Sequence, residues 1–232
     1  MPLPRRPLAA LICALALVPI ACGGDDPEDE TAAQAPATET SEQPATGCPT
    51  AKAPEPKQDG GAKPPAGLLD PGKIYGVTLK TTCGDMVIRL DQKTSPKTAA
   101  SFVALVRSGF FEDTVFHRIV PGFVIQGGDP TGTGTGGPGY STRDKPPADA
   151  RYTLGTVAMA KSATEAPGTA GSQFYIVTAP DAGLPPQYAL LGKVVSGLDV
   201  VRKIGELGDP ASGDQGLPLQ AVILESATVS GG

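Results

Sequence analysis

The chain has 232 residues, a formal net charge of −5, 30 glycines and 25 prolines. So many glycine and proline residues exclude uniform packing along the whole chain, and we expect one part to fold while another stays unfolded. The net charge also excludes the strongly basic composition that is typical of proteins that bind nucleic acid.

Residues 1–22 are predicted to form a secretory signal peptide. Arg5 and Arg6 precede an apolar run over residues 8–21, and this run ends at a small residue before Cys22. A membrane-spanning helix needs about 20 consecutive apolar residues. Because the run is shorter and is interrupted by proline, we expect export and cleavage rather than anchoring by a helix.

The end of this segment resembles the lipobox of bacterial lipoproteins. It reads Ala21-Cys22-Gly23-Gly24, although Pro19 stands where the motif normally has leucine or a similar residue. The resemblance implies that Cys22 is acylated and anchors the protein in the cell envelope, at the outer face of the cytoplasmic membrane. The alternative is a plain secreted protein whose Cys22 leaves with the signal peptide.

Residues 23–67 are predicted to form a disordered, acidic tether. They are rich in Pro, Ala, Thr and Glu and lack large apolar residues, so they bury too little surface to offset the entropy of ordering. Nine acidic residues against three lysines give the tether a net charge of −6, whereas residues 68–232 carry −1. The acidity of the chain therefore belongs to the tether, and residues 68–232 are the predicted folded domain.

The cysteines allow one pair in the mature protein. Cys13 and Cys22 lie in the signal region, which leaves Cys48 and Cys83 as the possible partners in an oxidising compartment. A disulfide between them would attach the end of the tether to the first strand of the domain. Closing this loop would contribute about 3 to 4 kcal/mol in the chain-entropy model. Two free thiols are the alternative.

The folded domain begins with a predicted hairpin and a helix. Two β-rich runs, Ile74–Thr82 and Met86–Leu90, are separated by a short turn that contains glycine. A helix follows, with Ser95 as its N-cap and Pro96 at its first position, and it ends before Gly109.

Short apolar runs recur through the rest of the domain. They cover residues 115–120, 123–126, 155–160, 173–177, 190–195 and 221–229, and a second helix is expected over residues 198–204. Many short strands with Gly and Pro turns, together with two amphipathic helices, indicate a mostly β fold, either a sandwich or a barrel with helical caps.

The stretch over residues 116–130 holds the strongest functional signal. It places Arg118, Phe123 and Gln126 among β-forming residues and turn glycines, so a cation, a ring and an amide can converge on one face of a sheet. The segment over residues 171–177 adds another amide and two aromatic side chains. Such a face suits an uncharged, partly apolar ligand.

Both stretches resemble the two signature segments of the cyclophilins, a family of peptidyl-prolyl cis-trans isomerases, and the similarity continues in order from about Val77 to the C-terminus. The resemblance implies a closed, eight-stranded antiparallel β-barrel capped by two α-helices, with no cofactor. It also implies that Arg118 is the catalytic cation. A surface salt bridge to Asp129 or Glu112 is the alternative for an arginine on a strand.

The resemblance assigns the remaining site residues one by one. It implies that Gln126 is catalytic with Arg118, and that the substrate-binding residues are Phe123, Val124, Ala160, Gln173, Tyr175, Leu184 and Tyr188. The departures of the chain from the family pattern include three single positions. Tyr175 replaces the usual phenylalanine, Lys161 replaces a frequent asparagine, and Gly183 falls where many members carry tryptophan.

The other motifs do not support a different chemistry. The glycine-rich segment over residues 132–137 matches a dinucleotide-binding fingerprint, but a Pro-Gly pair follows where a helix should begin. His117 is the only histidine, and its apolar neighbours indicate a packed structural residue rather than a general base. No spacing typical of a metal site occurs, so we expect no metal.

The sequence therefore predicts an exported cyclophilin-type isomerase that contacts a membrane only through its N-terminal lipid. We expect a monomer that binds proline-containing unfolded or extended polypeptides among secreted and envelope proteins, and no nucleic acid. The departures at Tyr175, Lys161 and Gly183 leave a rival open, a tethered binding or chaperone module with little turnover. Hydrolase chemistry ranks third.

Overall fold

The structure is a computed structural model that describes residues 47–232. The predicted signal peptide 1–22, the acylation of Cys22 and residues 23–46 of the predicted tether lie outside the described residues. Within the described range, no helix is long and apolar enough to cross a bilayer.

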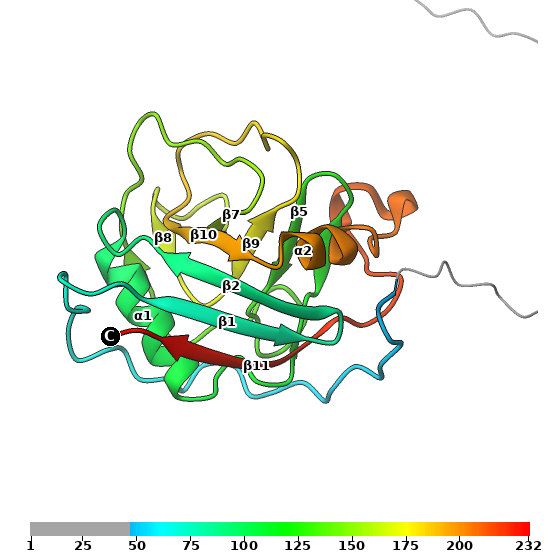
Figure 1. Cartoon of the computed structure of the whole chain (residues 1–232), viewed down its shortest axis with the longest axis horizontal. Coiled ribbons are helices and arrows are strands. Elements are labelled where there is room, and N and C mark those ends of the chain that lie inside the picture. Colours follow the sequence, from blue (N-terminus) through cyan, green and yellow to red (C-terminus); the bar gives the residue numbers. More distant parts are fainter. Residues whose placement is uncertain (1–46) are drawn as a thin grey trace, which may run out of the picture. The chain divides into compact units, whose positions relative to one another are not determined.

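The described chain consists mainly of short β-strands, with two α-helices and one 3-10 segment (Figure 1). The strands are β1 (Gly76–Thr81), β2 (Gly84–Leu90), β3 (Thr114–Val115), β4 (Arg118–Val120), β5 (Val124–Gly127), β6 (Thr142–Arg143), β7 (Thr156–Met159), β8 (Thr169–Ala170), β9 (Phe174–Val177), β10 (Leu190–Ser196) and β11 (Ile223–Ser230). The helical segments are α1 (Pro96–Arg107), α2 (Leu198–Gly205) and the 3-10 segment η1 (Pro210–Gln215).

Nine of these strands form one antiparallel sheet in the order β3-β11-β1-β2-β10-β7-β9-β5-β4, and β6 and β8 form a separate ribbon. The prediction of a mostly β fold is confirmed. The prediction of a closed eight-stranded barrel is wrong, because β3 and β4 stand at opposite ends of the sheet order and do not pair with each other.

Backbone groups of these end strands and of the residues between them bond to other parts of the chain. The amide of Ile119 in β4 donates to the carbonyl of Gly216, directly after η1, at 2.7 Å. The amide of Phe116, between the two strands, donates to the carbonyl of Val222 at 3.0 Å. The Ile119 amide of β4 is thus bonded to the segment after η1, and β4 does not pair with β3.

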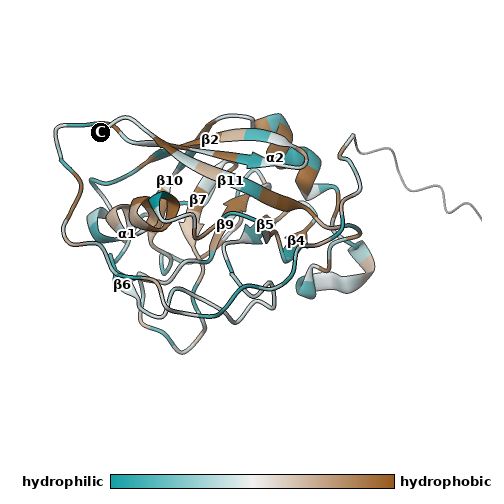
Figure 2. Ribbon diagram, turned by 90° about the horizontal axis from the view of Figure 1, so that it is seen from below, coloured by the Kyte–Doolittle hydropathy of each residue, from teal (hydrophilic) through white to brown (hydrophobic). Residues whose placement is uncertain are grey.

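The main core joins the inner face of the sheet to both helices. Alternate side chains of β1 and β2, such as Val77 and Ile88, are fully buried. Phe102 of α1 packs edge-on against Phe174 of β9, with ring centroids 5.5 Å apart. Helix α1 contacts β11 and β6, whereas α2 contacts β2, β4 and β5. Figure 2 shows the hydrophobic segments gathered on the strands and helices.

The predicted hairpin is confirmed, with a small shift in its turn. β1 and β2 pair as far as Thr81 opposite Gly84, so Thr82 and Cys83 form the turn, one residue earlier than predicted. Gly84 has a φ of +126°, which residues with a side chain rarely adopt.

Helix α1 begins where the sequence predicts, but its cap is different. Ser95 precedes Pro96 as expected, yet its buried hydroxyl bonds to no partner among the described residues. Instead, the Asp144 carboxylate accepts a hydrogen bond from the Thr98 amide at 2.7 Å. A carboxylate at this end also interacts favourably with the helix dipole. The cap therefore comes from a distant part of the chain.

Residues 47–67, which we call the strap, are bonded to the part of the chain that follows residue 68. A disulfide joins Cys48 to Cys83, one of the two alternatives that the sequence left open. Main-chain hydrogen bonds run from the amides of Lys57, Gly60 and Ala62 to the carbonyls of Pro130 (2.8 Å), Gly137 (2.9 Å) and Pro138 (3.1 Å), respectively. Composition indicated disorder because it counts apolar side chains, whereas backbone hydrogen bonds and a covalent bond hold the strap.

Candidate active site

A cavity of about 230 Å³ lies beside strands β4, β5 and β9. Arg118 comes from β4, Val124 and Gln126 from β5, and Tyr175 from β9. The residues that line it are Arg118, Phe123, Val124, Gln126, Ala160, Lys161, Tyr175, Leu184 and Tyr188. All of them except Lys161 were predicted site residues. The remaining one, Gln173, lies next to the cavity and bonds to Gln126.

Arg118 is held by two hydrogen bonds from its guanidinium. Nε donates to the carbonyl of Asp214 at 3.0 Å, and Nη1 donates to Oε1 of Gln126 at 3.3 Å. Gln126 lies directly opposite Arg118 in the pairing of β4 with β5. Within residues 47–232, Nη2 makes no hydrogen bond and Arg118 forms no salt bridge, so the surface pairing with Asp129 or Glu112 is not formed.

The guanidinium keeps its charge in a partly buried setting. Burial lowers the pKa of Arg118, while the nearby Asp214 and Tyr188 act in the opposite direction. Arginine stays protonated in proteins near neutral pH. The cavity therefore holds a permanent, partly desolvated cation with one nitrogen available to donate.

A chain of amide hydrogen bonds continues from Arg118. Gln126 Nε2 donates to Gln173 Oε1 at 3.0 Å. Gln173 Nε2 in turn donates to the carbonyls of Gly134 and Gly136, at 3.0 and 2.9 Å. Each amide is thereby fixed in orientation, and the chain links Arg118 to the glycine-rich loop over residues 132–139.

Asp129 holds this glycine-rich loop in place. Its carboxylate is fully buried and accepts bonds from the amides of Thr131, Gly134 and Gly136 and from the Thr131 hydroxyl. Burial alone would raise the pKa of Asp129, but these hydrogen bonds outweigh it and lower the pKa. A Cβ on Gly136 would overlap the carboxylate, so the loop requires glycine there.

Three tyrosines form a cluster of rings, and two of them, Tyr175 and Tyr188, line the cavity. The ring centroids of Tyr175 and Tyr188 lie 5.5 Å apart, and those of Tyr152 and Tyr188 lie 5.8 Å apart. The Tyr152 hydroxyl donates to the carbonyl of Tyr188 at 2.7 Å and accepts from the amide of the same residue at 3.0 Å. Tyr152 thus fixes the backbone that carries Tyr188.

Tyr175 lines the cavity with a ring whose hydroxyl is buried. The residue is 4% exposed, and its hydroxyl has no hydrogen-bond partner among the described residues. Burial raises the pKa of Tyr175, so the group stays neutral. Tyr175 therefore carries a neutral, buried hydroxyl where the cyclophilin pattern usually has a plain ring.

His117 lies under the glycine-rich loop rather than in the cavity. Neither ring nitrogen has a hydrogen-bond partner within the described chain, and a Cβ on Gly134 would sit 3.6 Å from its Cδ2. Burial lowers the pKa of His117, with Asp129 opposing this effect. In residues 47–232, no cluster of three or more His, Cys, Asp or Glu side chains could hold a metal ion.

Sequence reasoning missed two residues that support the site. Tyr152 and the carbonyl of Asp214 position Tyr188 and Arg118, but both are distant in sequence from the groups they hold. No local pattern marks either one. Only the fold brings the segment after α2 against β4.

Comparisons with known proteins agree with this geometry. The family model described as cyclophilin type peptidyl-prolyl cis-trans isomerase/CLD matches residues 76–229. The chain is 36% identical over 157 residues to peptidyl-prolyl cis-trans isomerase-like 1 of Gibberella zeae, a match that covers 66% of this chain and 93% of that protein. It is 39% identical over 145 residues to peptidyl-prolyl cis-trans isomerase-like 1 of Mus musculus, covering 61% of this chain and 84% of that protein.

Solved structures give the same result. A crystal structure of a cyclophilin type peptidyl-prolyl cis-trans isomerase of Cryptosporidium parvum matches with a TM-score of 0.61 and 31% identity, covering 68% of this chain and 98% of that one. A second structure of that protein, in the presence of the dipeptide Ala-Pro, matches with a TM-score of 0.60, 32% identity and coverage of 67% and 98%. The fold, the cavity and these matches together show that the chain belongs to the cyclophilin-type peptidyl-prolyl cis-trans isomerase family of enzymes.

Proposed function

We propose that this protein accelerates rotation about X–Pro bonds in exported or envelope proteins and thereby assists their folding. Resonance gives the peptide bond a rotation barrier of about 18 to 20 kcal/mol, so an X–Pro bond isomerises in tens to hundreds of seconds unaided. No bond has to be made or broken. The catalyst needs only to hold the proline and to favour the twisted amide over both planar forms.

The observation that carries the proposal is a cation with one uncommitted nitrogen at the edge of a partly apolar cavity. Hydrogen bonds to Asp214 and Gln126 fix the guanidinium of Arg118. As the amide twists, conjugation is lost and the prolyl nitrogen gains a lone pair that Nη2 can bind. Phe123, Val124 and Leu184 offer apolar surface for the pyrrolidine ring.

The free energy of such hydrogen bonds is comparable to the lowering of the rotation barrier that catalysis requires. Shortening a step from tens of seconds to milliseconds takes about four decades in rate, or about 5 to 6 kcal/mol. One or two charge-assisted hydrogen bonds supply about 1.5 to 3 kcal/mol each, and they are stronger where water is partly excluded.

Replacing Arg118 tests the mechanism. Arg118→Ala should lower kcat/KM in a protease-coupled assay on a short Ala-Pro peptide by about 100-fold, because the twisted amide loses its donor. Peptide binding, measured by calorimetry, should survive. Arg89→Ala is the matched control, since Arg89 is also a strand arginine but is exposed on β2. Normal turnover in Arg118→Ala would contradict the assigned role.

The rival function is a proline-peptide binding or chaperone module with little turnover. Tyr175 is the observation in its favour, because this lining residue carries an unpaired buried hydroxyl where the family pattern has a plain phenylalanine ring. Wild-type protein that binds the Ala-Pro peptide without accelerating its isomerisation would favour this rival over the isomerase.

We also propose that the protein acts outside the cytoplasm, attached by an acyl chain on Cys22. The support is the lipobox-like end of residues 1–22 and the tether that follows. Cys22→Ser should abolish labelling by a radioactive fatty acid and release the protein into the soluble fraction. A mature wild-type protein that lacks Cys22 would contradict this.

A further inference from the structure

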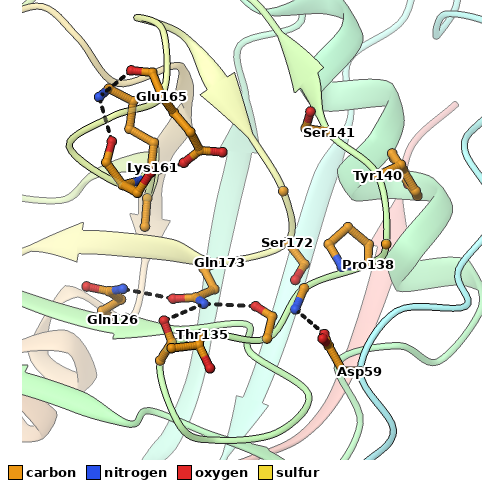
Figure 3. A pocket seen from close by; sticks show the side chains of 17 residues that line it. Asp59, Gln126, Thr135, Pro138, Tyr140, Ser141, Lys161, Glu165, Ser172 and Gln173 are labelled. Carbon is orange, nitrogen blue, oxygen red and sulfur yellow. Dashed lines mark hydrogen bonds between the residues drawn. The ribbon is translucent and has the colours of Figure 1, made fainter.

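A second, larger cavity lies next to the Arg118 cavity and shares Gln126, Ala160 and Lys161 with it. Its volume is about 590 Å³ (Figure 3). The glycine-rich loop over residues 132–139 forms one side. Because the two cavities share a wall, a peptide whose proline occupies the first cavity passes beside the second.

The strap contributes to this second cavity through Asp59. Asp59 Oδ1 accepts a hydrogen bond from the amide of Gly137 at 2.8 Å. The amide of Gly60 donates to the carbonyl of Gly137 at 2.9 Å, and that of Ala62 to the carbonyl of Pro138 at 3.1 Å. Three bonds from residues 59–62 therefore fix the far side of the glycine-rich loop.

The near side of the same loop is bonded to the active-site amides. Its Gly134 and Gly136 carbonyls accept from Gln173, which accepts from Gln126, which accepts from Arg118. An unbroken series of hydrogen bonds thus runs from the strap through the loop to the guanidinium. Figure 3 shows the Asp59 and Gln173 ends of this series on opposite sides of the loop.

The charges around the second cavity are not balanced. Lys161 Nζ donates to the carbonyls of Ser162 and Glu165, and the Glu165 carboxylate accepts from the Ser162 amide at 2.6 Å. Asp59 is exposed, and its second oxygen, Oδ2, bonds to no group within residues 47–232. Two carboxylates and one ammonium leave a net negative rim, with Asp59 Oδ2 open to a ligand.

We propose that the strap is part of the substrate site: Asp59 positions the glycine-rich loop, and its carboxylate favours substrates that bring a lysine or arginine side chain into the second cavity. This rests on the proposed isomerase function and adds a substrate preference to it. The two roles of Asp59 are separable, because an asparagine in its place keeps the oxygen that accepts from Gly137 but removes the charge.

The test uses the full chain and a series of peptides that contain Ala-Pro. Two positions before the pair and two positions after it are varied one at a time, and each carries Lys, Gln or Glu in turn. Wild type should turn over the Lys peptide about twofold to fivefold faster than the Gln peptide at one position, since exposed charge pairs contribute this much. Asp59→Asn should lose that preference, because it removes the charge and keeps an oxygen that can accept from Gly137. Asp59→Ala should lose the preference and also lower kcat about twofold to tenfold, the worth of one hydrogen bond.

Glu55→Ala is the control, since it removes the same charge from an exposed strap residue that does not line the cavity. It should match wild type on every peptide. Asp59→Ala and Asp59→Asn that both match wild type would overturn the inference while leaving the isomerase function intact. Wild type without turnover would reject the proposed function instead. In that case the preference is measured as the ratio of the Kd values for the Gln and Lys peptides. Wild type without a preference for the Lys peptide would overturn the inference. An Asp59→Asn variant that keeps the wild-type preference would overturn it as well.

Discussion

Two tyrosines in one cluster show how the surroundings of a hydroxyl decide what it contributes. The Tyr152 hydroxyl is fully engaged with the backbone of Tyr188, as both donor and acceptor. The Tyr175 hydroxyl, equally cut off from solvent, has no partner in the described chain. A buried polar group without a partner costs free energy, whereas a paired one is close to neutral or stabilising.

Removing each hydroxyl should therefore change stability in opposite directions. Tyr175→Phe should raise the free energy of unfolding by about 1 kcal/mol, because it removes an unpaired buried group. Tyr152→Phe should lower it by about 1 to 2 kcal/mol, because it leaves the Tyr188 amide and carbonyl unpaired. Urea unfolding of the two variants beside wild type measures both changes. Shifts of the same sign would contradict this account.

At the scale of an element, the strap shows how a segment without an apolar face can be ordered. The Cys48–Cys83 disulfide fixes one end to the β1–β2 turn, and the backbone bonds to residues 130–138 fix the rest. Cys83 is 5% exposed and packs in the main core, so its end of the disulfide is rigid. The disulfide has a sequence separation of 35 residues.

Reduction of this disulfide should destabilise the protein by about 3 to 4 kcal/mol in the chain-entropy model. Guanidinium unfolding with and without a reductant, at equal protein concentration, measures the difference. The Cys48→Ser variant is the control, because it should unfold at the lower midpoint in both conditions. An unchanged wild-type midpoint after complete reduction would show that the disulfide adds nothing to stability.

At the scale of the whole molecule, local sequence patterns predicted the individual strands and helices better than the way in which the strands join into a sheet. The β1–β2 hairpin, both α-helices and most strands follow from alternation, helical spacing and turn residues within a few positions. The cap of α1 by Asp144, the support of Tyr188 by Tyr152 and the ordering of the strap depend on contacts between distant segments. No pattern in a single stretch of sequence encodes such contacts.

In the candidate site, too, the sequence indicated the side chains but not the groups that orient them. The side chains lie on two contiguous stretches, on one loop and, for Ala160, directly after β7, and the family resemblance assigned them residue by residue. What orients them comes from outside those stretches: the Asp214 carbonyl and, through the glycine-rich loop, the strap. The open sheet was missed because the family resemblance implied closure, whereas hydrogen bonding of Ile119 to Gly216 takes up the edge of β4.

The missing pairing between β3 and β4 raises the question of whether other polypeptides can add to these strand edges. Unpaired strand edges recruit extended polypeptides by adding them as further strands, which is how many aggregates begin. Here the terminal strands β3 and β4 have only two and three residues, and the β4 edge is shielded by the turn after η1. This part of the sheet therefore offers little free strand edge to which an extended polypeptide could add as a further strand.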